Sequence, residues 1–271
     1  MNIAHDFHIH TERSLCAYRD AFAKDYIAKA KEMGLKKIGF ADHFWDSAYR
    51  PLDFLFYEIQ NYDHLATIKA EIESADTEGI EVYFGCEAEY SPEHGVAITE
   101  ECAEKFDFII VPNSHTHKTM PAEYAKPDYK AAHLEFMERA YYNILESPVS
   151  EKILSMAHPF DAVCCPYDNN ELKRMLTDDK MKYLFNATAE KGIAVEINIG
   201  SMKVFDESTI EKAEEIRMFN IAKEMGCKFV FGSDAHNVHN YKDYYLDKCN
   251  MMVNVLSLKE SDIFDIDAFL K

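Results

Sequence analysis

Two histidines separated by one residue, His8 and His10, lie in the opening segment Asp6-Phe7-His8-Ile9-His10 of this chain. On an extended strand successive side chains alternate between faces, so the two imidazoles are predicted to share one face, with Phe7 and Ile9 on the other. Paired imidazoles on one face are typical of half a metal site. The alternative is an edge strand with two exposed histidines, and the rest of the chain decides between them.

Similar polar residues recur at the ends of apolar segments along the whole chain. Each segment is interpreted as a strand, and the stretches between them have helical periodicity. Gly34, Gly192 and Gly226 directly follow three of these helices, a position that helix C-termini favour. The residues after Met251 are expected to cap the outside of the fold. Strands are predicted at 6–10, 37–43, 80–87, 106–112, 153–158, 193–198 and 227–232, and helices at 22–33, 57–74, 101–105, 129–145, 172–190 and 209–225.

Seven strands alternating with helices predict one α/β domain over residues 1–271, with parallel strands. Closure of these strands gives a distorted (β/α)7 TIM-like barrel, in which the chemistry lies at the C-terminal ends of the strands. An open, doubly wound sheet is the alternative, but it would spread the strand ends along an edge. The barrel instead gathers the polar strand ends at one mouth: His8, His10, His43, Glu87, His115, His158, Asn198, Asp234 and His236.

Composition limits the partners of this mouth. The formal net charge of −19 repels nucleic acid and anionic membranes. No apolar stretch is long enough to span a membrane and the N-terminus resembles no secretion signal, so a cytoplasmic location is expected. The seven cysteines, including adjacent Cys164 and Cys165, lack disulfide-like spacing and are expected to be reduced. An anionic substrate then needs a local cationic centre, which metal ions supply. The oligomeric state is not indicated.

Histidines mixed with carboxylates suit borderline divalent ions such as Zn, Mn or Fe. Because more than four candidate ligands converge, two or more divalent metal ions are predicted. A multinuclear site can hold a bridging hydroxide as nucleophile and clamp the oxygens of a phosphate ester. The expected partner is therefore a small phosphorylated substrate, and no nucleophilic side chain is required.

The successive motifs resemble those of the PHP (polymerase and histidinol phosphatase) family, in the same order over nearly the whole chain. The resemblance implies a distorted (β/α)7 barrel, up to three metal ions and phosphoesterase activity. It is carried by His8-Ile9-His10, Ala41-Asp42-His43, Gly85-Cys86-Glu87-Ala88-Glu89, Ser114-His115, Ala157-His158-Pro159 and Gly232-Ser233-Asp234-Ala235-His236. By motif, it implies one ion on His8, His10, Glu87 and Asp234, a second on Glu87, His115 and His158, a third on His43 and His236, and a catalytic hydroxide held by Glu87, Asp234 and His10.

Cys16 departs from the family pattern. It stands six residues after His10, where the family usually has a His or Asp ligand for the third ion. A thiolate binds Zn or Fe but suits Mn or Mg poorly. Two interpretations stay open: Cys16 is a metal ligand, or it is an inert small residue and Asp20 or water takes its place.

Other residues are candidates for supporting roles. Asp6 and Glu89 are candidates for orienting metal ligands, with a solvated or capping carboxylate as the alternative. The resemblance places Asn198 in the lining of the substrate pocket. The aromatic-rich segment 44–62 either forms a lid over the mouth or packs on the barrel rim. Candidates for phosphate or general-acid contacts are Arg13, Arg19, Arg50, His117, Lys203 and His239, each with an ordinary surface residue as the alternative.

The function predicted from these features is a metal-dependent phosphomonoesterase in which a metal-bound hydroxide attacks phosphorus. The single-domain length resembles the histidinol-phosphatase branch, so L-histidinol phosphate, converted to histidinol in histidine biosynthesis, is the leading substrate. An arginine often found in that branch after Glu196-Ile197-Asn198 is not evident, since Gly200-Ser201-Met202-Lys203 occupies the place. A nucleotide or sugar phosphate therefore stays open as substrate. Two other classes are an amidohydrolase, whose usual bridging lysine these strand ends lack, and a non-catalytic PHP module.

Overall fold

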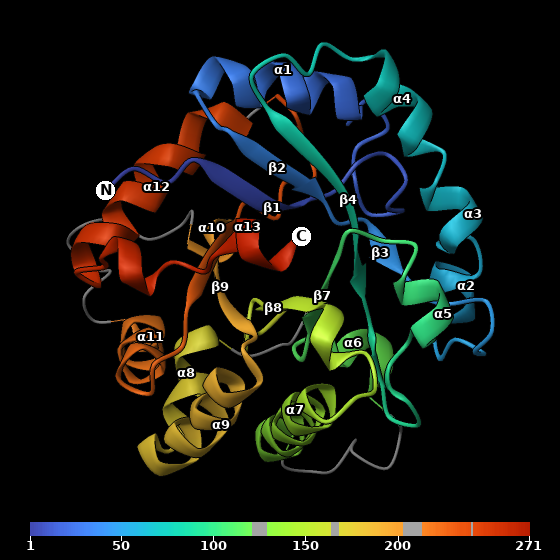
Figure 1. Ribbon diagram of the computed structural model, residues 1–271. Coiled ribbons are helices and arrows are strands. Elements are labelled where there is room, and N and C mark those ends of the chain that lie inside the picture. Colours follow the sequence, from blue (N-terminus) through green and yellow to red (C-terminus); the bar gives the residue numbers. More distant parts are fainter. Residues whose placement is uncertain (121–128, 164–167, 203–212, 240) are drawn as a thin grey trace.

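The computed structural model describes residues 1–120, 129–163, 168–202, 213–239 and 241–271. In this part of the chain seven parallel strands form a nearly closed barrel surrounded by helices (Figure 1). The predicted α/β barrel is thereby confirmed. The order around the barrel is β1 (His5–Ile9), β2 (Lys37–Phe40), β4 (Glu81–Ala88), β7 (Phe108–Pro112), β8 (Ile153–Ala157), β9 (Ala194–Asn198) and β10 (Phe229–Gly232).

Backbone hydrogen bonds between the last and first strands close the ring. The Asp234 N–H donates to the His8 carbonyl at 2.7 Å, and the His10 N–H donates to the Ala235 carbonyl at 2.9 Å. These bonds lie at the C-terminal ends of β1 and β10, next to the residues that the sequence marks as metal ligands. Closure of the barrel and assembly of the mouth therefore depend on the same stretch of backbone.

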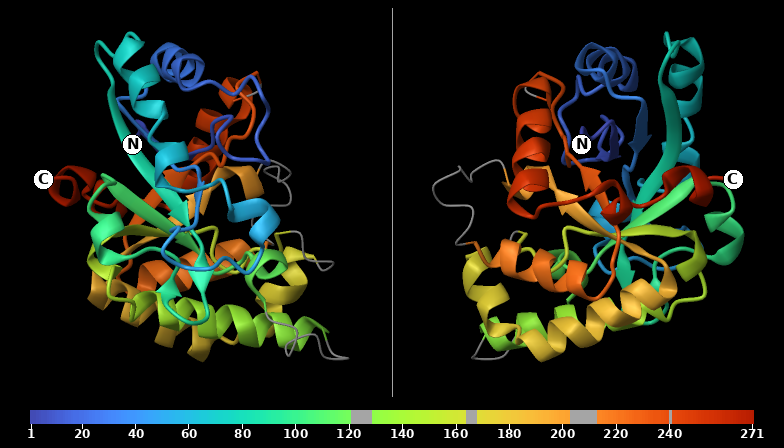
Figure 2. Two further views of the ribbon diagram at one scale, coloured as in Figure 1. Left: turned by 90° about the vertical axis from the view of Figure 1, so that its right-hand side faces the viewer. Right: turned by 60° about the vertical axis from the view of Figure 1, so that its left-hand side comes forward.

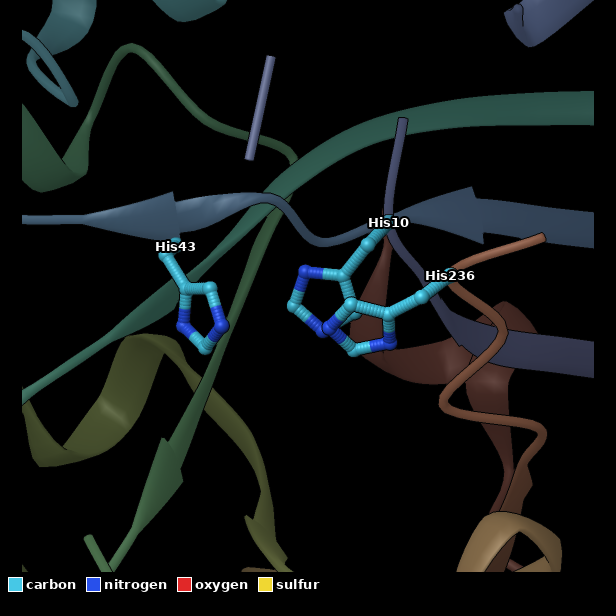
Figure 3. Close-up of side chains that lie close together, drawn as sticks. All are labelled: His10, His43 and His236. Carbon is cyan, nitrogen blue, oxygen red and sulfur yellow. The ribbon is translucent and has the colours of Figure 1, made fainter. Parts of the chain in front are cut away.

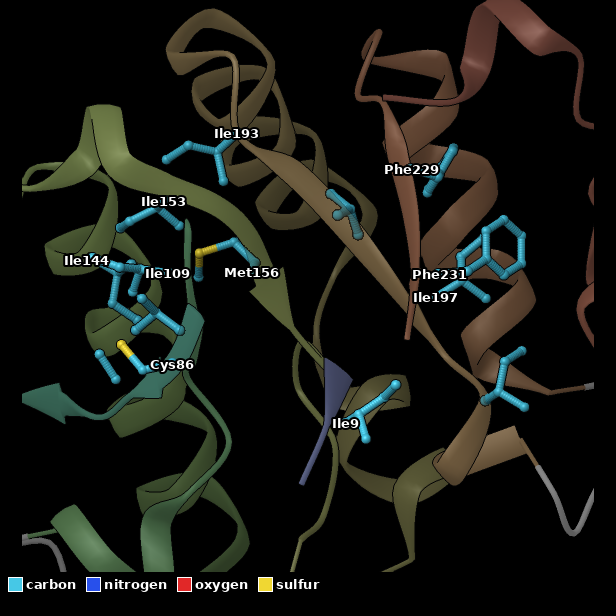
Figure 4. Close-up of a cluster of buried hydrophobic side chains, with 14 of the residues drawn as sticks. Ile9, Cys86, Ile109, Ile144, Ile153, Met156, Ile193, Ile197, Phe229 and Phe231 are labelled. Atoms are coloured by element: carbon cyan, nitrogen blue, oxygen red, sulfur yellow. The ribbon is translucent and has the colours of Figure 1, made fainter. Parts of the chain in front are cut away.

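An apolar layer lies between the strands and the outer helices. Figure 4 shows part of it, where Ile109 of β7 and Met156 of β8 lie near Ile144 of a covering helix. The longer helices are α1 (Ala23–Met33), α4 (Ile68–Ser74), α7 (Tyr129–Leu145), α8 (Asn169–Met175), α9 (Asp178–Lys191), α11 (Glu214–Glu224) and α12 (Tyr241–Val255). The shorter elements are β3 (His43–Phe44), α2 (Phe54–Tyr57), α3 (Tyr62–Leu65), β5 (Tyr90–Ser91), β6 (Gly95–Val96), α5 (Glu100–Ala103), α6 (Thr116–Thr119), η2 (Ser150–Lys152), α10 (Ile199–Met202), η4 (Glu260–Asp262) and α13 (Ile266–Phe269).

Side-chain caps divide two of the predicted helices. The helix expected at 57–74 is instead three short helices, because the Asn61 side chain accepts the His64 N–H and starts a new turn. The helix expected at 172–190 is two helices, because Thr177 caps α9 by accepting the Lys180 N–H. The strand expected at 37–43 is interrupted after Phe40 and resumes as β3. Residues 209–212 of another predicted helix lie outside the described residues.

One extra residue in β1 corrects the predicted face alternation. Asp6 pairs with Ile38 and Ile9 with Phe40, so three steps along β1 match two along β2. This bulge turns Phe7 away from the side that Ile9 faces, and the two side chains belong to different apolar clusters. The bulge thereby allows Phe7 to lie inside the barrel below the mouth, while the two histidines lie at the mouth.

Aromatic rings fill the barrel below the mouth. The buried rings of Phe7 and Phe108 meet with centroids 5.1 Å apart, and they pack in one cluster with Leu154 and Val230. Glycine at position 39 makes this possible, because a Cβ there would lie 2.5 Å from Phe108 Cζ and 2.7 Å from Phe7 Cδ1. Apolar side chains thus exclude water from beneath the polar end of the barrel.

The C-terminal residues close the opposite end of the barrel, which corrects the expectation that they cap its outside. Ile266 is part of the cluster of Phe7 and Phe108, and Phe264 and Phe269 pack against it. Figure 2 shows α13 at one end of the barrel. The tail was misplaced because its apolar residues do not by themselves indicate which barrel surface they cover. No helix in the described ranges is both long and apolar enough to cross a membrane.

Replacing Gly39 by alanine is expected to destabilise the protein by about 1–3 kcal/mol, because the new methyl group overlaps two buried rings. The free energy of unfolding is to be measured by urea denaturation. Phe108→Leu is expected to lower stability alone but to recover part of the Gly39→Ala loss in the double variant. Strictly additive effects of the two substitutions would contradict a direct overlap.

His5 is expected to make stability fall in acid. Its buried Nε2 accepts the Phe231 N–H at 3.1 Å, and burial, with the nearby Lys37 charge, lowers its pKa to about 4. The folded state therefore binds fewer protons than the unfolded state between pH 6.5 and 4, so the stabilisation is complete above this window and declines through it. Denaturation of the metal-free protein should show a loss about 2 kcal/mol larger between pH 7 and 4.5 in the wild type than in His5→Gln. Equal losses would contradict this role of His5.

Candidate metal centre

The C-terminal ends of five barrel strands and of β3 converge on one cluster of histidines and carboxylates. Its members are buried except Asp234 and His236, which are partly exposed. Figure 3 shows His10, His43 and His236 approaching one another from three different segments, and the His10 ring centroid is 4.5 Å from that of His43 and 4.2 Å from that of His236. The cluster comprises His8, His10, His43, Glu87, His115, His158, Asp234 and His236, which are all the metal ligands predicted from sequence except Cys16.

In five of these histidines, the Nδ1 atom lies within hydrogen-bond distance of an oxygen atom. Such a contact favours the tautomer with its proton on Nδ1, which leaves the lone pair of Nε2 free to bind a metal ion. Ser14, for example, donates its own proton to Asp42 at 2.7 Å and so accepts from His10. The contacts are His8 with Glu196 (2.7 Å), His10 with Ser14 (3.0 Å), His115 with Glu89 (3.0 Å), His158 with Ser114 (2.7 Å) and His236 with the Asp234 carbonyl (3.0 Å).

The spacing of the inward-facing atoms fits a first divalent ion. The Nε2 atoms of His8 and His10 are 3.0 Å apart, so that a proton shared between them, or a cation bound by both, satisfies the pair. Asp234 Oδ1 lies 3.6 Å from His8 Nε2 and 3.4 Å from His10 Nε2, and Glu87 oxygens lie 3.6 Å from each. Four tetrahedral ligands at about 2.1 Å from an ion are separated by about 3.4 Å. His8, His10 and Glu87 form one compact group that fits the ion implied for them, and Asp234 lies against the two histidines.

Glu87 lies between two groups of candidate metal ligands. One oxygen lies 3.0 Å from His158 Nε2 and 3.9 Å from His115 Nε2, so the same carboxylate also faces a second group. The other oxygen is buried and makes no hydrogen bond within the described residues, although His43 Nδ1 is 2.8 Å away. Unpaired buried donors and acceptors of this kind are satisfied when an ion binds between them. Glu89 joins this group as well: His43, Glu87, Glu89 and His115 each place a ligand atom within 4.8 Å of the others.

Charge keeps the two central carboxylates ionised. Burial alone would raise the pKa of Glu87, but His115, His43 and His8 hold it well below its usual range. Burial opposes ionisation of Asp234 in the same way, and His8 and His10 lower its pKa well below the usual value. In the metal-free protein protonated imidazoles supply this charge: although burial opposes it, the neighbouring carboxylates raise the pKa of His8 and His158. Divalent ions would take the place of these protons, and carboxylates mixed with imidazoles are the ligand set that borderline divalent ions bind.

Glu196 is a functional residue that the sequence reasoning missed. Its Oε1 accepts from His8 Nδ1, while Oε2 accepts the His158 backbone N–H at 2.7 Å, so one carboxylate orients two ligands. Gly232 makes room for it, because any Cβ at that position would collide with the Glu196 carboxylate and the His8 Cβ. The available signal was a carboxylate inside the apolar strand Ala194–Asn198, which is costly to bury unless it has a partner.

A cavity of about 350 Å³ opens over the cluster. Glu87, Asp234 and four histidines of the cluster, His43, His115, His158 and His236, form its floor, while Phe56 and Tyr57 of α2 contribute an aromatic wall. Tyr57 is buried against Trp45, so the segment 44–62 both packs on the rim and lines the cavity. The lining residues are Cys16, His43, Phe56, Tyr57, Glu87, His115, His117, Lys118, His158, Val163, Asp234 and His236.

Most of the residues predicted as candidates for substrate contacts do not line this cavity. His117 lines the cavity, whereas Arg13 is bound to Glu12 and Glu71. Asn198 donates to Glu196 at 3.2 Å and does not line the cavity. His239 pairs with Asp20 on the exposed surface, and Lys203 lies outside the described residues. Arg19 and Arg50 are exposed.

Asp6, predicted to orient metal ligands, instead holds backbone. Its carboxylate accepts the N–H groups of His8 at 3.1 Å and Ser233 at 2.9 Å, together with the Tyr241 hydroxyl at 2.8 Å. It thereby ties the end of β10 to the middle of β1. Asp6 positions the strands that carry the ligands, without contacting a ligand side chain.

Comparisons with known proteins agree with the motifs. The model of the PHP domain family matches residues 6–200, which include every cluster member before β10. A protein of Shewanella frigidimarina (strain NCIMB 400) and one of Shewanella sp. (strain MR-4), both named "Probable phosphatase", are each 26% identical over 232 residues. This alignment covers 85% of this chain and 77% and 75% of those proteins, respectively.

Solved structures of similar fold come from two further bacteria. One is a histidinol phosphate phosphatase from Lactococcus lactis subsp. lactis Il1403 complexed with zinc, L-histidinol and phosphate. It is 18% identical with a TM-score of 0.62, and the match covers 94% of each chain. Another, from Listeria monocytogenes, is assigned as a histidinol phosphatase and is 14% identical with a TM-score of 0.55, over 89% of this chain and 99% of that one. At these identities the structures establish the shared fold.

Replacing Glu196 by glutamine is expected to weaken binding of the first ion about 10- to 100-fold, because His8 loses its carboxylate partner. Titration of the metal-free protein with Zn²⁺ against a competing chelator measures this affinity. Glu93→Gln, at an exposed position, serves as the matched control and should leave the affinity unchanged. Equal affinities of the wild type and Glu196→Gln would contradict an orienting role.

Proposed function

This chain belongs to the PHP domain family, and from that premise we propose that it is a metal-dependent phosphomonoesterase that hydrolyses a small phosphate ester. The observation that supports this activity is the buried set of free Nε2 atoms and ionised carboxylates on the floor of the cavity. In this proposal one ion binds to His8, His10, Glu87 and Asp234, and a second to Glu87, His115 and His158. A third lies at His43 and His236.

Divalent ions in these positions supply positive charge to the phosphoryl oxygens and lower the pKa of the water that attacks phosphorus. The chain's own contribution is rigid placement of the ligands. Glu196, Ser14 and Glu89 fix three imidazole rings from behind. Glu87 belongs to two groups of ligands and would contribute to both ion positions.

A histidine in the wall of the cavity bears on how the leaving group receives its proton. His117 lines the cavity and stays partly exposed to solvent; its partial desolvation there, together with the neighbouring His115, lowers its pKa to about 4. At neutral pH this ring is therefore uncharged and serves as a hydrogen-bond partner for the substrate. A neutral His117 is not a ready proton donor to the departing alcohol.

L-Histidinol phosphate is the proposed substrate. The cavity of about 350 Å³ lies near the lower end of the range for ligand cavities and favours a compact ester. Phe56 and Tyr57 offer aromatic surface on which an imidazole ring can pack. The related Lactococcus structure, which contains L-histidinol and phosphate, supports the same choice. Other compact esters, such as sugar phosphates or nucleotides, are the competing substrates.

Metal-loaded protein is expected to release phosphate from L-histidinol phosphate with a kcat/KM at least tenfold higher than for sugar phosphates or nucleotides. Glu87→Gln is expected to lower kcat at least about 100-fold, because it removes the shared carboxylate from the centre. Elemental analysis of each preparation establishes its metal content. Absence of phosphate release from every ester at full metal content would overturn the phosphatase proposal, and a better ester would overturn only the substrate.

A further inference from the structure

We propose that Cys16 supplies a thiolate to the third ion position, beside His43 and His236, and makes that position selective for thiophilic ions such as Zn²⁺, Co²⁺ or Fe²⁺ over Mn²⁺ or Mg²⁺. The proposal rests on the metal centre proposed above and concerns the chemistry of its outermost position. It decides between the two interpretations of Cys16 that the sequence leaves open.

The sulfur faces a nitrogen that is prepared to bind metal. Cys16 Sγ lies 3.2 Å from His236 Nε2, and the Nδ1 of the same ring lies 3.0 Å from the Asp234 carbonyl, which can only accept a hydrogen bond. Nδ1 therefore carries the proton, and Nε2 presents its lone pair to the sulfur. A Zn–S distance of about 2.3 Å and a Zn–N distance of about 2.1 Å allow both atoms to reach one ion across this gap.

An unsatisfied nitrogen of His43 is a second, independent sign of a ligand. His43 is only 7% exposed, and its Nδ1 makes no hydrogen bond among the described residues, although Oε2 of Glu87, which also lacks one, is 2.8 Å away. Its ring lies across from His10 and His236 in Figure 3, and the three imidazoles each place a nitrogen within 4.8 Å of the others. Cys16 borders the same cavity. The sulfur thus lies at the edge of this group of three histidines, against His236.

The loop that carries Cys16 is fixed on both sides of the cysteine. Before it, the Leu15 N–H donates to the Gln60 side chain at 3.0 Å; after it, the Tyr18 N–H donates to the His236 carbonyl at 3.0 Å. The second bond joins the loop to the very residue whose imidazole the sulfur faces. This arrangement holds a ligand in place before any ion arrives, which reduces the ordering cost of binding.

The chemistry of sulfur makes the site discriminate between ions. Thiolate is a soft ligand that binds Zn²⁺, Co²⁺ and Fe²⁺ well, whereas Mn²⁺ and Mg²⁺ prefer oxygen. The first two positions are built from imidazole and carboxylate alone and have no such preference against Mn²⁺. The expected pattern is therefore two equivalents of bound Mn²⁺ but three equivalents of Zn²⁺ or Co²⁺.

Cobalt reports directly on a bound thiolate, because Co²⁺ coordinated by sulfur has a near-ultraviolet charge-transfer absorption that nitrogen and oxygen ligands do not produce. Titrating metal-free protein with Co²⁺ is expected to produce this band as the third equivalent binds. Cys16→Ser should lose the band and bind the third equivalent at least tenfold more weakly. Cys102→Ala, at a buried cysteine that does not line the cavity, is the control and should keep the band.

A second variant separates ligand chemistry from folding. Cys16→Asp restores an oxygen ligand at this position, so it should lack the band but regain a third equivalent of metal and accept Mn²⁺ there. Absence of the band in fully loaded wild type, or its persistence in Cys16→Ser, would overturn the proposal. Because the band is read without substrate, it can appear in a protein that hydrolyses no ester, and an active enzyme without the band would refute only the role of Cys16.

Discussion

The crowding of imidazole nitrogens and carboxylates at the barrel mouth is the constraint on which the site depends. An oxygen atom contacts Nδ1 in each of five imidazoles, so Nε2 is the atom left to bind at the mouth, where the Glu87 and Asp234 carboxylates also lie. His8 and His10, with Nε2 atoms 3.0 Å apart, could relax by turning their rings if Glu196 and Ser14 did not hold them. The fold therefore holds these nitrogen and oxygen atoms in an arrangement that cations or protons stabilise. Metal ions and protons must compete for the same atoms.

The scaffold meets this constraint because closure of the barrel and placement of the ligands use the same residues. The bonds that join β10 to β1 involve the backbone of His8, His10 and Asp234, whose side chains belong to the cluster. Asp6 reinforces the junction by accepting from His8 and Ser233. A barrel that failed to close would lose the first ion position. The aromatic filling beneath excludes water and strengthens every electrostatic interaction above it.

The sequence predicted the barrel and the eight clustered histidines and carboxylates because each lies at the end of an apolar segment, and parallel strands end on one side. For Glu196 it offered only a carboxylate inside an apolar strand and not its partners, because its role depends on a gap left by Gly232 on the neighbouring strand, 36 positions away in sequence. It also could not place Arg13, since only the tertiary structure brings Glu71 against that guanidinium. Asn61 and Thr177 are residue types that favour helix N-caps, so the two helix boundaries were predictable. The apolar periodicity continues across both boundaries, however, and favoured a single helix in each case.

The wall of the cavity indicates how an acidic protein would hold a phosphate. Lys118 is the one lysine or arginine among the described residues that line the cavity. Its ammonium is already paired with Asp53 at 2.9 Å and lies 3.7 Å from the centre of the Phe56 ring. Asp53 is correspondingly stabilised as a carboxylate, since its hydrogen bond with Lys118 lowers its pKa. A lysine neutralised in this way contributes little net charge to a phosphate dianion. In the proposed mechanism, capture of the phosphoryl group therefore depends on the metal ions, and Lys118 instead joins α2, with its aromatic wall, to α6.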